Sequence, residues 1–321
     1  MRYKTLGRTG LRVSSVALGT WAIGGKNWGN VDDTESINAI HRMLELGVNF
    51  VDCAPTYGKG HAEEILGQAL AGRRDKVTLL TKCGIRWPDE NKKNFNQGAI
   101  RDSSRASLIK QIDDSLRRLK TDYIDVYMIH WPDVNTPLEE TVDALNEIKK
   151  AGKIRFTGVS NFDEPLLSQL YELNALDVVQ FPYSMVNRSR VKELRQFHSK
   201  GVGTMSYGSL GAGILTGTIR ELPKFAADDA RLGFYDFFVE PKFSMVMELL
   251  KTMDKVAESR GVPVAQVAVN WNVQNEFITT SIMGVRNRKE AEENCAAFDW
   301  ELSPEEMDVL NRAIMDSMGS E

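Results

Sequence analysis

Short apolar runs alternate with amphipathic segments along almost the whole chain. Eight of the apolar runs, rich in β-branched residues and bounded by polar or glycine-containing turns, indicate β-strands. Each is followed by a segment whose apolar residues recur every three or four positions, as on one face of a helix. The strands are expected over residues 16–19, 48–52, 76–82, 123–130, 154–159, 178–181, 203–206 and 277–283.

Several of the intervening helices carry recognisable ends. Asp32 or Asp33 is suited to cap the first helix, and Gly47, Gly152 and Gly201 are suited to end three helices at the carboxyl side. The helices are expected over residues 33–46, 62–70, 105–119, 137–151, 164–173, 190–199, 242–259 and 289–297, with a last helix from residue 311 onward.

Eight strand–helix units in one series predict an α/β fold, a (β/α)8 TIM barrel with parallel strands. A doubly wound sheet in two lobes would need a linker, and no segment has that composition, so residues 1–321 are expected to form one domain. Residues 3–13 contain Gly7-Arg8-Thr9-Gly10 between two short extended runs. They are expected to form a β-hairpin that plugs the amino-terminal end of the barrel.

Residues 215–241, after the seventh strand, form the longest stretch without a clear helix or strand pattern. A loop of that length in a compact domain is usually functional or mobile. Its mixture of charged and aromatic residues suits a lid over a ligand, and an ordered surface excursion fits it equally well.

Composition narrows the class of protein. The net charge is −4 and 42% of the residues are hydrophobic, so nothing indicates a nucleic-acid or anionic-membrane partner. No apolar run approaches the ~18 residues of a membrane span. The first residues have no apolar signal-peptide core, which favours a cytoplasmic protein. Three cysteines and four scattered histidines lack the spacing of a disulfide framework or a metal site. The oligomeric state stays open.

Polar residues at the ends of three neighbouring strands are candidates for chemistry, because the active site of such a barrel lies at the carboxyl ends of its strands. The second strand ends at Asp52, with Tyr57 five residues later; the third ends at Lys82 and the fourth at His130. Adjacent strands lie ~4.8 Å apart, so these four side chains can converge over one side of the barrel mouth.

The alternation of side chains along a strand turns Asp52 and Lys82 inward and the following Cys53 and Cys83 toward the helices. The two cysteines are therefore expected to be packing residues. Taken alone, Lys82 beside Asp52 fits an ordinary ion pair. With Tyr57 nearby, the ammonium is expected to lower the pKa of the phenol and make it a usable proton donor and acceptor.

His130 could orient a carbonyl oxygen through one ring N–H. The set can thus hold a carbonyl and deliver a proton, while a hydride would have to come from a cofactor. The chain has no G-x-G-x-x-G after its first strand and no Y-x-x-x-K, so a Rossmann dehydrogenase is disfavoured. In a barrel, the glycine-rich residues 206–213 and 284–288 are suited to a phosphate group.

These residues and their surroundings resemble the aldo-keto reductases, and within them the bacterial general-stress and inositol-operon branch. The resemblance extends from about Tyr3 to Asn311. The motifs that carry it include Leu18-Gly19-Thr20-Trp21, Asp52-Cys53-Ala54-Pro55-Thr56-Tyr57-Gly58, Glu63-Glu64-Ile65-Leu66-Gly67, Gly158-Val159-Ser160-Asn161-Phe162 and Glu292-Glu293-Asn294.

The resemblance implies an NAD(P)(H)-dependent oxidoreductase in which Tyr57 is the general acid, Lys82 and Asp52 tune it, and His130 orients the carbonyl. It also implies that Ser160, Asn161 and Gln180 hold the nicotinamide carboxamide and that Tyr207 stacks on the ring. The remaining cofactor contacts that it implies are Thr20, Trp21, Gly208, Ser209, Leu210, Gly211, Gly213, Gly284, Arg286, Glu290, Glu293 and Asn294, and its pocket walls are Trp21, Trp28, Trp87 and Trp131.

Two positions depart from the family pattern. Glu290 stands where the family usually has Arg or Gln facing the 2′-phosphate, and a carboxylate there suits a ribose diol. Ala212 stands where close relatives often have Arg. Since Arg286 and Arg288 remain to bind a phosphate, NADP(H) is slightly favoured and NAD(H) stays a live alternative.

The expected substrate is a small aldehyde, ketone or sugar, because the short tail that ends at Glu321 supplies no long loop for a bulky one. The same fold also admits a sugar or polyol dehydrogenase, a non-catalytic nucleotide-sensing subunit, and a Schiff-base lyase that uses Lys82. The last is disfavoured because Asp52 keeps that lysine charged.

Overall fold

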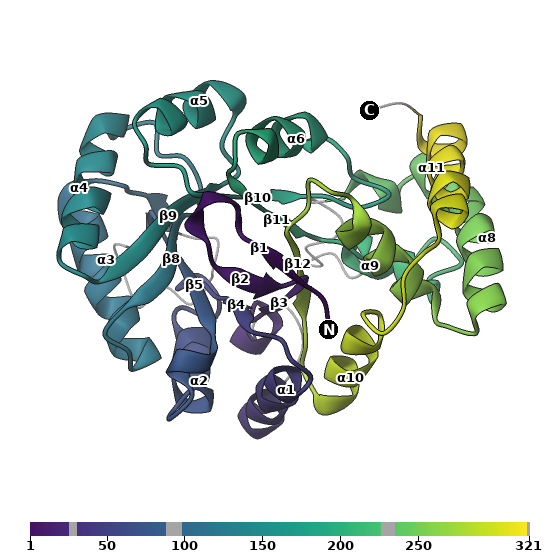
Figure 1. Cartoon of the computed structure of the whole chain (residues 1–321), viewed down its shortest axis with the longest axis horizontal. Helices are drawn as coiled ribbons and strands as arrows, with labels where there is room; N and C mark the ends of the chain where they lie inside the picture. Colours follow the sequence, from purple (N-terminus) through teal and green to yellow (C-terminus); the bar gives the residue numbers. More distant parts are fainter. Residues whose placement is uncertain (26–30, 88–97, 226–234, 320–321) are drawn as a thin grey trace.

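Eight parallel strands close into a barrel in the order in which they occur along the chain (Figure 1). The computed structural model describes residues 1–25, 31–87, 98–225 and 235–319. The barrel strands are β3 (Val16–Gly19), β4 (Phe50–Asp52), β5 (Thr78–Cys83), β8 (Ile124–Ile129), β9 (Ile154–Ser160), β10 (Val178–Pro182), β11 (Gly203–Tyr207) and β12 (Thr280–Gly284). β12 pairs with β3 and closes the ring, which confirms the predicted (β/α)8 barrel.

Helices follow the strands and surround the barrel in Figure 1. They are α1 (Asp33–Glu45), α2 (His61–Ala69), α3 (Arg105–Leu119), α4 (Leu138–Lys150), α5 (Glu164–Glu172), α6 (Val191–Ser199), α9 (Val264–Gln274) and α10 (Arg288–Ala296). Asp32 caps α1 by accepting a hydrogen bond from the Glu35 amide. Two further helices, α8 (Lys242–Arg260) and α11 (Pro304–Met318), pack against each other at the outside.

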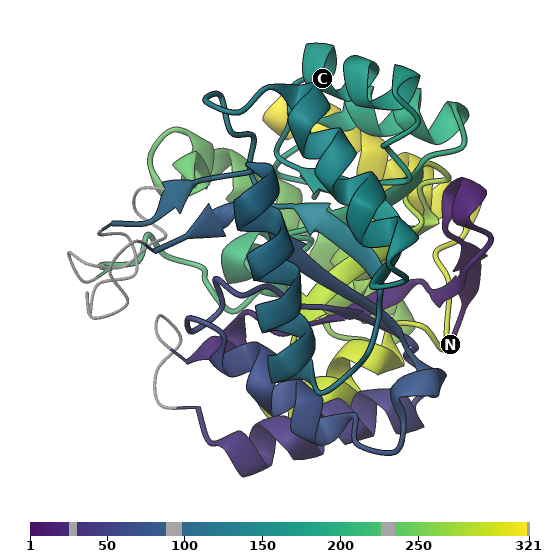
Figure 2. The ribbon, with the colours of Figure 1, turned by 90° about the vertical axis from the view of Figure 1, so that its left-hand side faces the viewer.

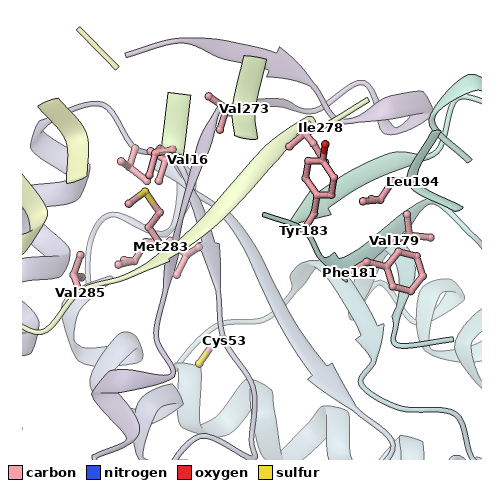
Figure 3. Packing of buried hydrophobic residues seen from close by; sticks show 14 of the residues in the cluster. Val16, Cys53, Val179, Phe181, Tyr183, Leu194, Val273, Ile278, Met283 and Val285 are labelled. Carbon is pink, nitrogen blue, oxygen red and sulfur yellow. The ribbon is translucent and has the colours of Figure 1, made fainter. Parts of the chain in front are cut away.

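Strand side chains alternate between two apolar regions. Those that face the helices join the main core, where Val179 and Phe181 of β10 lie beside Leu194 of α6 (Figure 3). Cys53 and Cys83 are buried in this same core, as the strand alternation predicts. Side chains that face the barrel axis form a second, smaller cluster, made of Leu6, Val13, Ala17, Phe50, Leu80, Val126, Met128, Val178 and Met205.

The predicted hairpin at the start of the chain plugs the barrel. β1 (Tyr3–Thr5) pairs antiparallel with β2 (Arg12–Ser14), and the one-turn helix η1 (Gly7–Thr9) joins them. Leu6 is fully buried in the axial cluster. The hairpin lies at one end of the barrel, and Figure 2 shows the small hairpin of β6 (Ile85–Arg86) and β7 (Ile100–Arg101) at the opposite end.

Several elements differ from the sequence-based expectation, among them the hairpin of β6 and β7, which was not predicted. The last helix begins at Pro304, not at residue 311, because Ser303 and Glu306 form a capping box there. Helix α9 was not expected, since its residues are buried on nearly every side and show little amphipathic period. The eighth strand begins at Thr280, three residues later than expected.

The long segment after β11 is partly outside the described residues, which omit 226–234. Its described part contains η4 (Gly211–Thr216) and η5 (Asp236–Phe238), and Phe237 and Phe238 are buried in the main core. These aromatic residues pack as part of the fold. Over the described ranges, no helix is both long and apolar enough to cross a membrane.

Close packing between the hairpin and the barrel predicts a large cost for one added methyl group. Gly7 and Gly10 both have positive φ, 49° and 70°, so an alanine at either site is strained by about 1–2 kcal/mol. Only at Gly7 would the new Cβ also lie 2.3 Å from the Gly203 amide nitrogen. Gly7→Ala should therefore lower the free energy of unfolding by about 3 kcal/mol or more.

Gly10→Ala is the matched control, because nothing lies within 4 Å of its added Cβ. Urea unfolding of both variants and the parent chain measures the difference. Equal destabilisation by the two substitutions would mean that the hairpin does not seat against the barrel at Gly203.

Candidate active site

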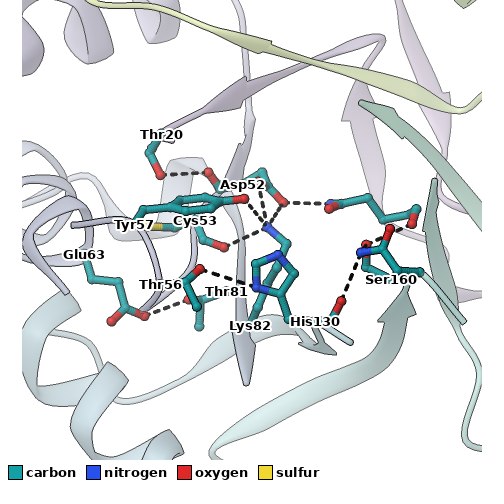
Figure 4. A network of polar contacts seen from close by, with 12 residues as sticks. Thr20, Asp52, Cys53, Thr56, Tyr57, Glu63, Thr81, Lys82, His130 and Ser160 are labelled. Atoms are coloured by element: carbon teal, nitrogen blue, oxygen red, sulfur yellow. Dashed lines mark hydrogen bonds and ion pairs between the residues drawn. The ribbon is translucent and has the colours of Figure 1, made fainter. Parts of the chain in front are cut away.

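The four residues nominated from strand ends converge at the mouth of the barrel (Figure 4). Asp52 is the last residue of β4, and Lys82 lies in the neighbouring β5. His130 follows β8, and its amide donates to the Cys83 carbonyl at 2.9 Å, which extends the pairing of β5 and β8 by one residue. Tyr57 comes from the turn after β4.

Lys82 is the centre of this arrangement, with its side chain fully buried. Its Nζ donates to both carboxylate oxygens of Asp52, at 2.8 and 2.7 Å, to the Cys53 carbonyl at 3.0 Å and to the Tyr57 hydroxyl at 3.1 Å. An ammonium has three hydrogens, so these three groups account for all of them. Lys82 therefore has no hydrogen left for a ligand.

The phenol oxygen of Tyr57 accepts from Lys82, and its own hydrogen consequently points elsewhere. The ring of Trp21 stacks over Tyr57, with ring centroids 6.4 Å apart and the planes inclined by 29°. Trp21 is 42% exposed. Tyr57 therefore contacts both the buried ammonium of Lys82 and the exposed ring of Trp21.

The electrostatics of Tyr57 correct one expectation. Burial and the negative charge of Asp52 raise the pKa of Tyr57 well above its usual value, whereas the sequence suggested that Lys82 would lower it. The physical reason is that Asp52 neutralises Lys82 at contact distance, so the phenol experiences an ion pair and not a free cation. The Tyr57 phenol therefore keeps its proton at neutral pH.

His130 is held as a neutral ring. Burial, helped by the charge of Lys82, lowers its pKa well below the usual value. The ring meets Tyr57 edge to face, with centroids 6.1 Å apart. Its Nδ1 lies 3.4 Å from the hydroxyl of Thr56, a residue that sequence reasoning missed because nothing in its spacing distinguishes it from other turn residues.

The residues expected around a nicotinamide lie together, and they bond to one another. Gln180 donates its side-chain amide to Asp52 at 2.8 Å, and the Ser160 hydroxyl donates to the Gln180 carbonyl at 3.0 Å. Asn161 donates to the Ser160 oxygen at 3.0 Å and accepts from the Tyr207 hydroxyl at 2.9 Å. A continuous polar network therefore runs from Tyr207 to the Asp52–Lys82 pair.

The loop after β11 leaves its backbone open in places. An added Cβ at Gly208 or Gly213, both with positive φ, would meet nothing within 4 Å, so a ligand can approach this backbone closely. Gly211 is different, because an added Cβ would lie 2.9 Å from Val186. Ser209 is buried and Leu210 is half-buried. The open backbone at Gly208 and Gly213 is compatible with the expected close approach of a pyrophosphate.

The other proposed cofactor contacts lie at the end of β12, in the turn that follows it and along α10. Arg286 donates to Glu290 from its backbone amide at 2.8 Å and from Nη2 at 2.6 Å. Asn294 donates to the Gly284 carbonyl at 3.2 Å, and Lys289 pairs with Glu293 at 3.6 Å. The guanidinium of Arg286, which was expected to be available to a 2′-phosphate, is therefore paired with the carboxylate of Glu290.

Thr20 and the tryptophans complete the nominated set. The Thr20 hydroxyl is buried and donates to the Asp52 carbonyl at 3.0 Å. Lys59 lies 5.9 Å from the ring centroid of Trp87, and Arg101 lies 5.2 Å from that of Trp131. Trp28 falls outside the described residues. Within the described ranges, no cluster of three His, Cys, Asp or Glu side chains could hold a metal ion.

Comparisons with known proteins identify the family. The Aldo/keto reductase family model matches residues 15–314. The aldo-keto reductase YhdN of Bacillus subtilis is 35% identical, over 100% of this chain and 97% of its own. The NADH-specific methylglyoxal reductase of Escherichia coli is 33% identical, over 94% and 95%.

Among solved structures, the glycerol dehydrogenase AKR11B4 from Gluconobacter oxydans superposes with a TM-score of 0.89 at 34% identity. The match covers 100% of this chain and 96% of that one. Both the sequence and the fold therefore agree over nearly the full length of each relative. The chain belongs to the aldo/keto reductase family, whose enzymes are oxidoreductases that use NAD(P)H.

Proposed function

We propose that this protein interconverts a small aldehyde, ketone or sugar carbonyl and the corresponding alcohol, with Tyr57 as the general acid or base. One observation carries the proposal: Lys82 Nζ lies 3.1 Å from the Tyr57 oxygen and 2.7 Å from Asp52. The contact places a cation beside the phenol oxygen, where it would stabilise the phenolate formed when Tyr57 gives its proton to a substrate.

The described residues also fit a nicotinamide dinucleotide. The backbone at Gly208 and Gly213 is open to a close approach, and Gln180, Ser160, Asn161 and Tyr207 offer amide, hydroxyl and aromatic groups next to the catalytic cluster. When bound, the reduced nicotinamide supplies the hydride that the side chains of this cluster cannot provide.

The chain's own residues supply the other half of the reaction. A carbonyl oxygen at the mouth accepts hydrogen bonds from the Tyr57 hydroxyl and from an N–H of neutral His130. As negative charge develops on that oxygen, Tyr57 transfers its proton to it. Lys82 then stabilises the phenolate through the hydrogen bond already in place, and Asp52 and Gln180 hold Lys82 in position.

A polyol or sugar dehydrogenase is the second candidate, because the same groups catalyse the reverse step. The similarity to a glycerol dehydrogenase at a TM-score of 0.89 favours it. For oxidation Tyr57 must first lose its proton, and its raised pKa opposes this at neutral pH. At neutral pH the Tyr57 phenol is therefore in the protonation state that reduction uses.

Removing the phenol hydroxyl tests the assignment of Tyr57. Tyr57→Phe should lower kcat for carbonyl reduction by about 10²–10⁴-fold, the usual contribution of a positioned general acid. The Kd of the cofactor should stay unchanged, because the hydroxyl's partner is Lys82. Steady-state kinetics on a panel of aldehydes, ketones and sugars, with NADPH and NADH, provides the measurement.

Tyr171→Phe is the control, since Tyr171 lies on α5 and its hydroxyl contacts only the Lys200 carbonyl among the described residues. Full turnover by Tyr57→Phe would refute the mechanism. A parent chain that binds the cofactor tightly but turns over no carbonyl would instead support a nucleotide-sensing subunit.

The pKa shifts predict opposite pH dependences for the two directions. Reduction needs the protonated phenol, so its kcat/KM should be flat near neutral pH and fall only in alkaline solution, above the raised pKa of Tyr57. Oxidation needs the phenolate, so its rate should rise with pH. His130 stays neutral near pH 6.5, because its pKa is lowered, and should add no limb there.

Rate profiles in both directions over about pH 5.5–10 check this expectation. His130→Ala is the control: it should lower the rate but leave the shape of both profiles unchanged. A limb near pH 6.5 that disappears in this variant would contradict the neutral imidazole.

Glu290 predicts the choice of cofactor. Glu290→Gln removes the carboxylate that now pairs with Arg286, and so frees the guanidinium for a 2′-phosphate. The Kd for NADPH should fall several-fold, which corresponds to a gain of about 1 kcal/mol in binding free energy. The Kd for NADH should stay nearly constant. Fluorescence titration of both cofactors measures the two constants.

Glu147→Gln is the control, because it also removes one negative charge. Glu147 lies on α4 and forms a surface ion pair with Arg105. A parallel shift for both cofactors, or the same shift in the control, would remove Glu290 as the residue that reads the 2′ position.

A further inference from the structure

Thr56 contacts His130 at the edge of the catalytic cluster. It lies in the turn between β4 and α2 and is only 5% exposed. Its hydroxyl oxygen is 3.4 Å from Nδ1 of His130, and Figure 4 shows it on the side of the imidazole that faces away from Ser160. Among the described residues, Nδ1 is the only hydrogen-bond partner of this hydroxyl.

The backbone of His130 is already fixed on both sides. Its amide donates to the Cys83 carbonyl at 2.9 Å, and its carbonyl accepts from Asn161 at 3.1 Å. The ring then packs edge to face against Tyr57. Two variables remain for the side chain, the rotation of the ring and the nitrogen that carries its hydrogen.

The second variable matters because the imidazole is neutral and has a single N–H. If the hydrogen is on Nδ1, the ring offers an acceptor at Nε2, which repels a carbonyl oxygen. If it is on Nε2, the ring offers a donor there. The hydrogen bond made by one ring nitrogen decides which tautomer is present.

We propose that Thr56 is a positioning residue: its hydroxyl donates to Nδ1 of His130 and thereby holds the ring as the Nε2–H tautomer, with the donor directed to the substrate. A threonine hydroxyl has one hydrogen, and a buried hydroxyl with a single acceptor in reach directs it there. The proposal rests on the proposed function, since only a carbonyl substrate needs that donor.

The tautomer can be read without any assay of activity. The ¹⁵N shifts of the ring nitrogens distinguish a protonated from an unprotonated Nδ1, and the chain has only four histidines. The His130 signals are assigned by their absence in His130→Asn. The parent chain and Thr56→Ser, which keeps the hydroxyl, should show an unprotonated, hydrogen-bonded Nδ1. Thr56→Val, which has nearly the same shape, should lose that hydrogen bond and populate the Nδ1–H tautomer.

Kinetics then connect the tautomer to catalysis. Thr56→Val should lower kcat about tenfold, the equivalent of one neutral hydrogen bond, with no change in the Kd of the cofactor. Thr56→Ser should restore kcat. A purely structural role would change the unfolding midpoint of Thr56→Val without moving the ring shifts, so both are measured.

Three results overturn the proposal: an Nδ1–H tautomer in the parent chain, parent-like ring shifts in Thr56→Val, or a changed tautomer with an unchanged kcat. A parent chain that reduces no carbonyl refutes the proposed function separately, because the ring shifts still show which tautomer Thr56 selects.

Discussion

The buried pair of Lys82 and Asp52 is the constraint on which the rest of the site depends. Taking two charges out of water costs several kcal/mol per ion, and removing one partner typically destabilises a protein by about 3–5 kcal/mol. The pair is therefore tenable only where β4 and β5 are neighbours and where further groups satisfy the remaining hydrogens and lone pairs. Cys53, Tyr57 and Gln180 are those groups. The barrel makes β4 and β5 neighbours, and the hydrogen bond from Lys82 holds the Tyr57 hydroxyl beside the ion pair.

Burial beside this pair sets the acid–base character of its neighbours. Both Tyr57 and His130 are buried beside it, and burial disfavours the charged form of each, so the pKa of the phenol rises and that of the imidazole falls. In the proposed mechanism these two neutral groups donate hydrogen bonds to the same carbonyl oxygen. Lys82 would then stabilise the reaction mainly after Tyr57 gives up its proton, because a cation 3.1 Å away stabilises a phenolate far more than a phenol.

Local sequence patterns predicted much of this arrangement. Apolar runs located the eight strands, and because parallel strands end at one face, Asp52, Lys82 and His130 could be grouped before any contact was known. The predictions that failed concerned features that depend on burial in the folded protein. Helix α9 is surrounded by protein and has no polar face to reveal it. The pKa of Tyr57 depends on a charge balance that spacing does not contain, and Thr56 becomes relevant only through the fold of its turn. Family resemblance, not periodicity, nominated the cofactor residues.

The polar network connects the residues proposed to hold the cofactor with those proposed to transfer the proton. Gln180 donates to Asp52 through its side chain and accepts from Ser160 through its backbone, so one residue belongs to both. A buried network with satisfied partners is rigid, and a ligand must match or replace the bonds it displaces. A carboxamide has one acceptor and two hydrogens to donate, which can join the oxygens and amides of Gln180, Ser160 and Asn161 without leaving any unpaired. Under the proposed function, this match of donors and acceptors is what would favour a nicotinamide carboxamide over a ligand that can only donate or only accept at these groups.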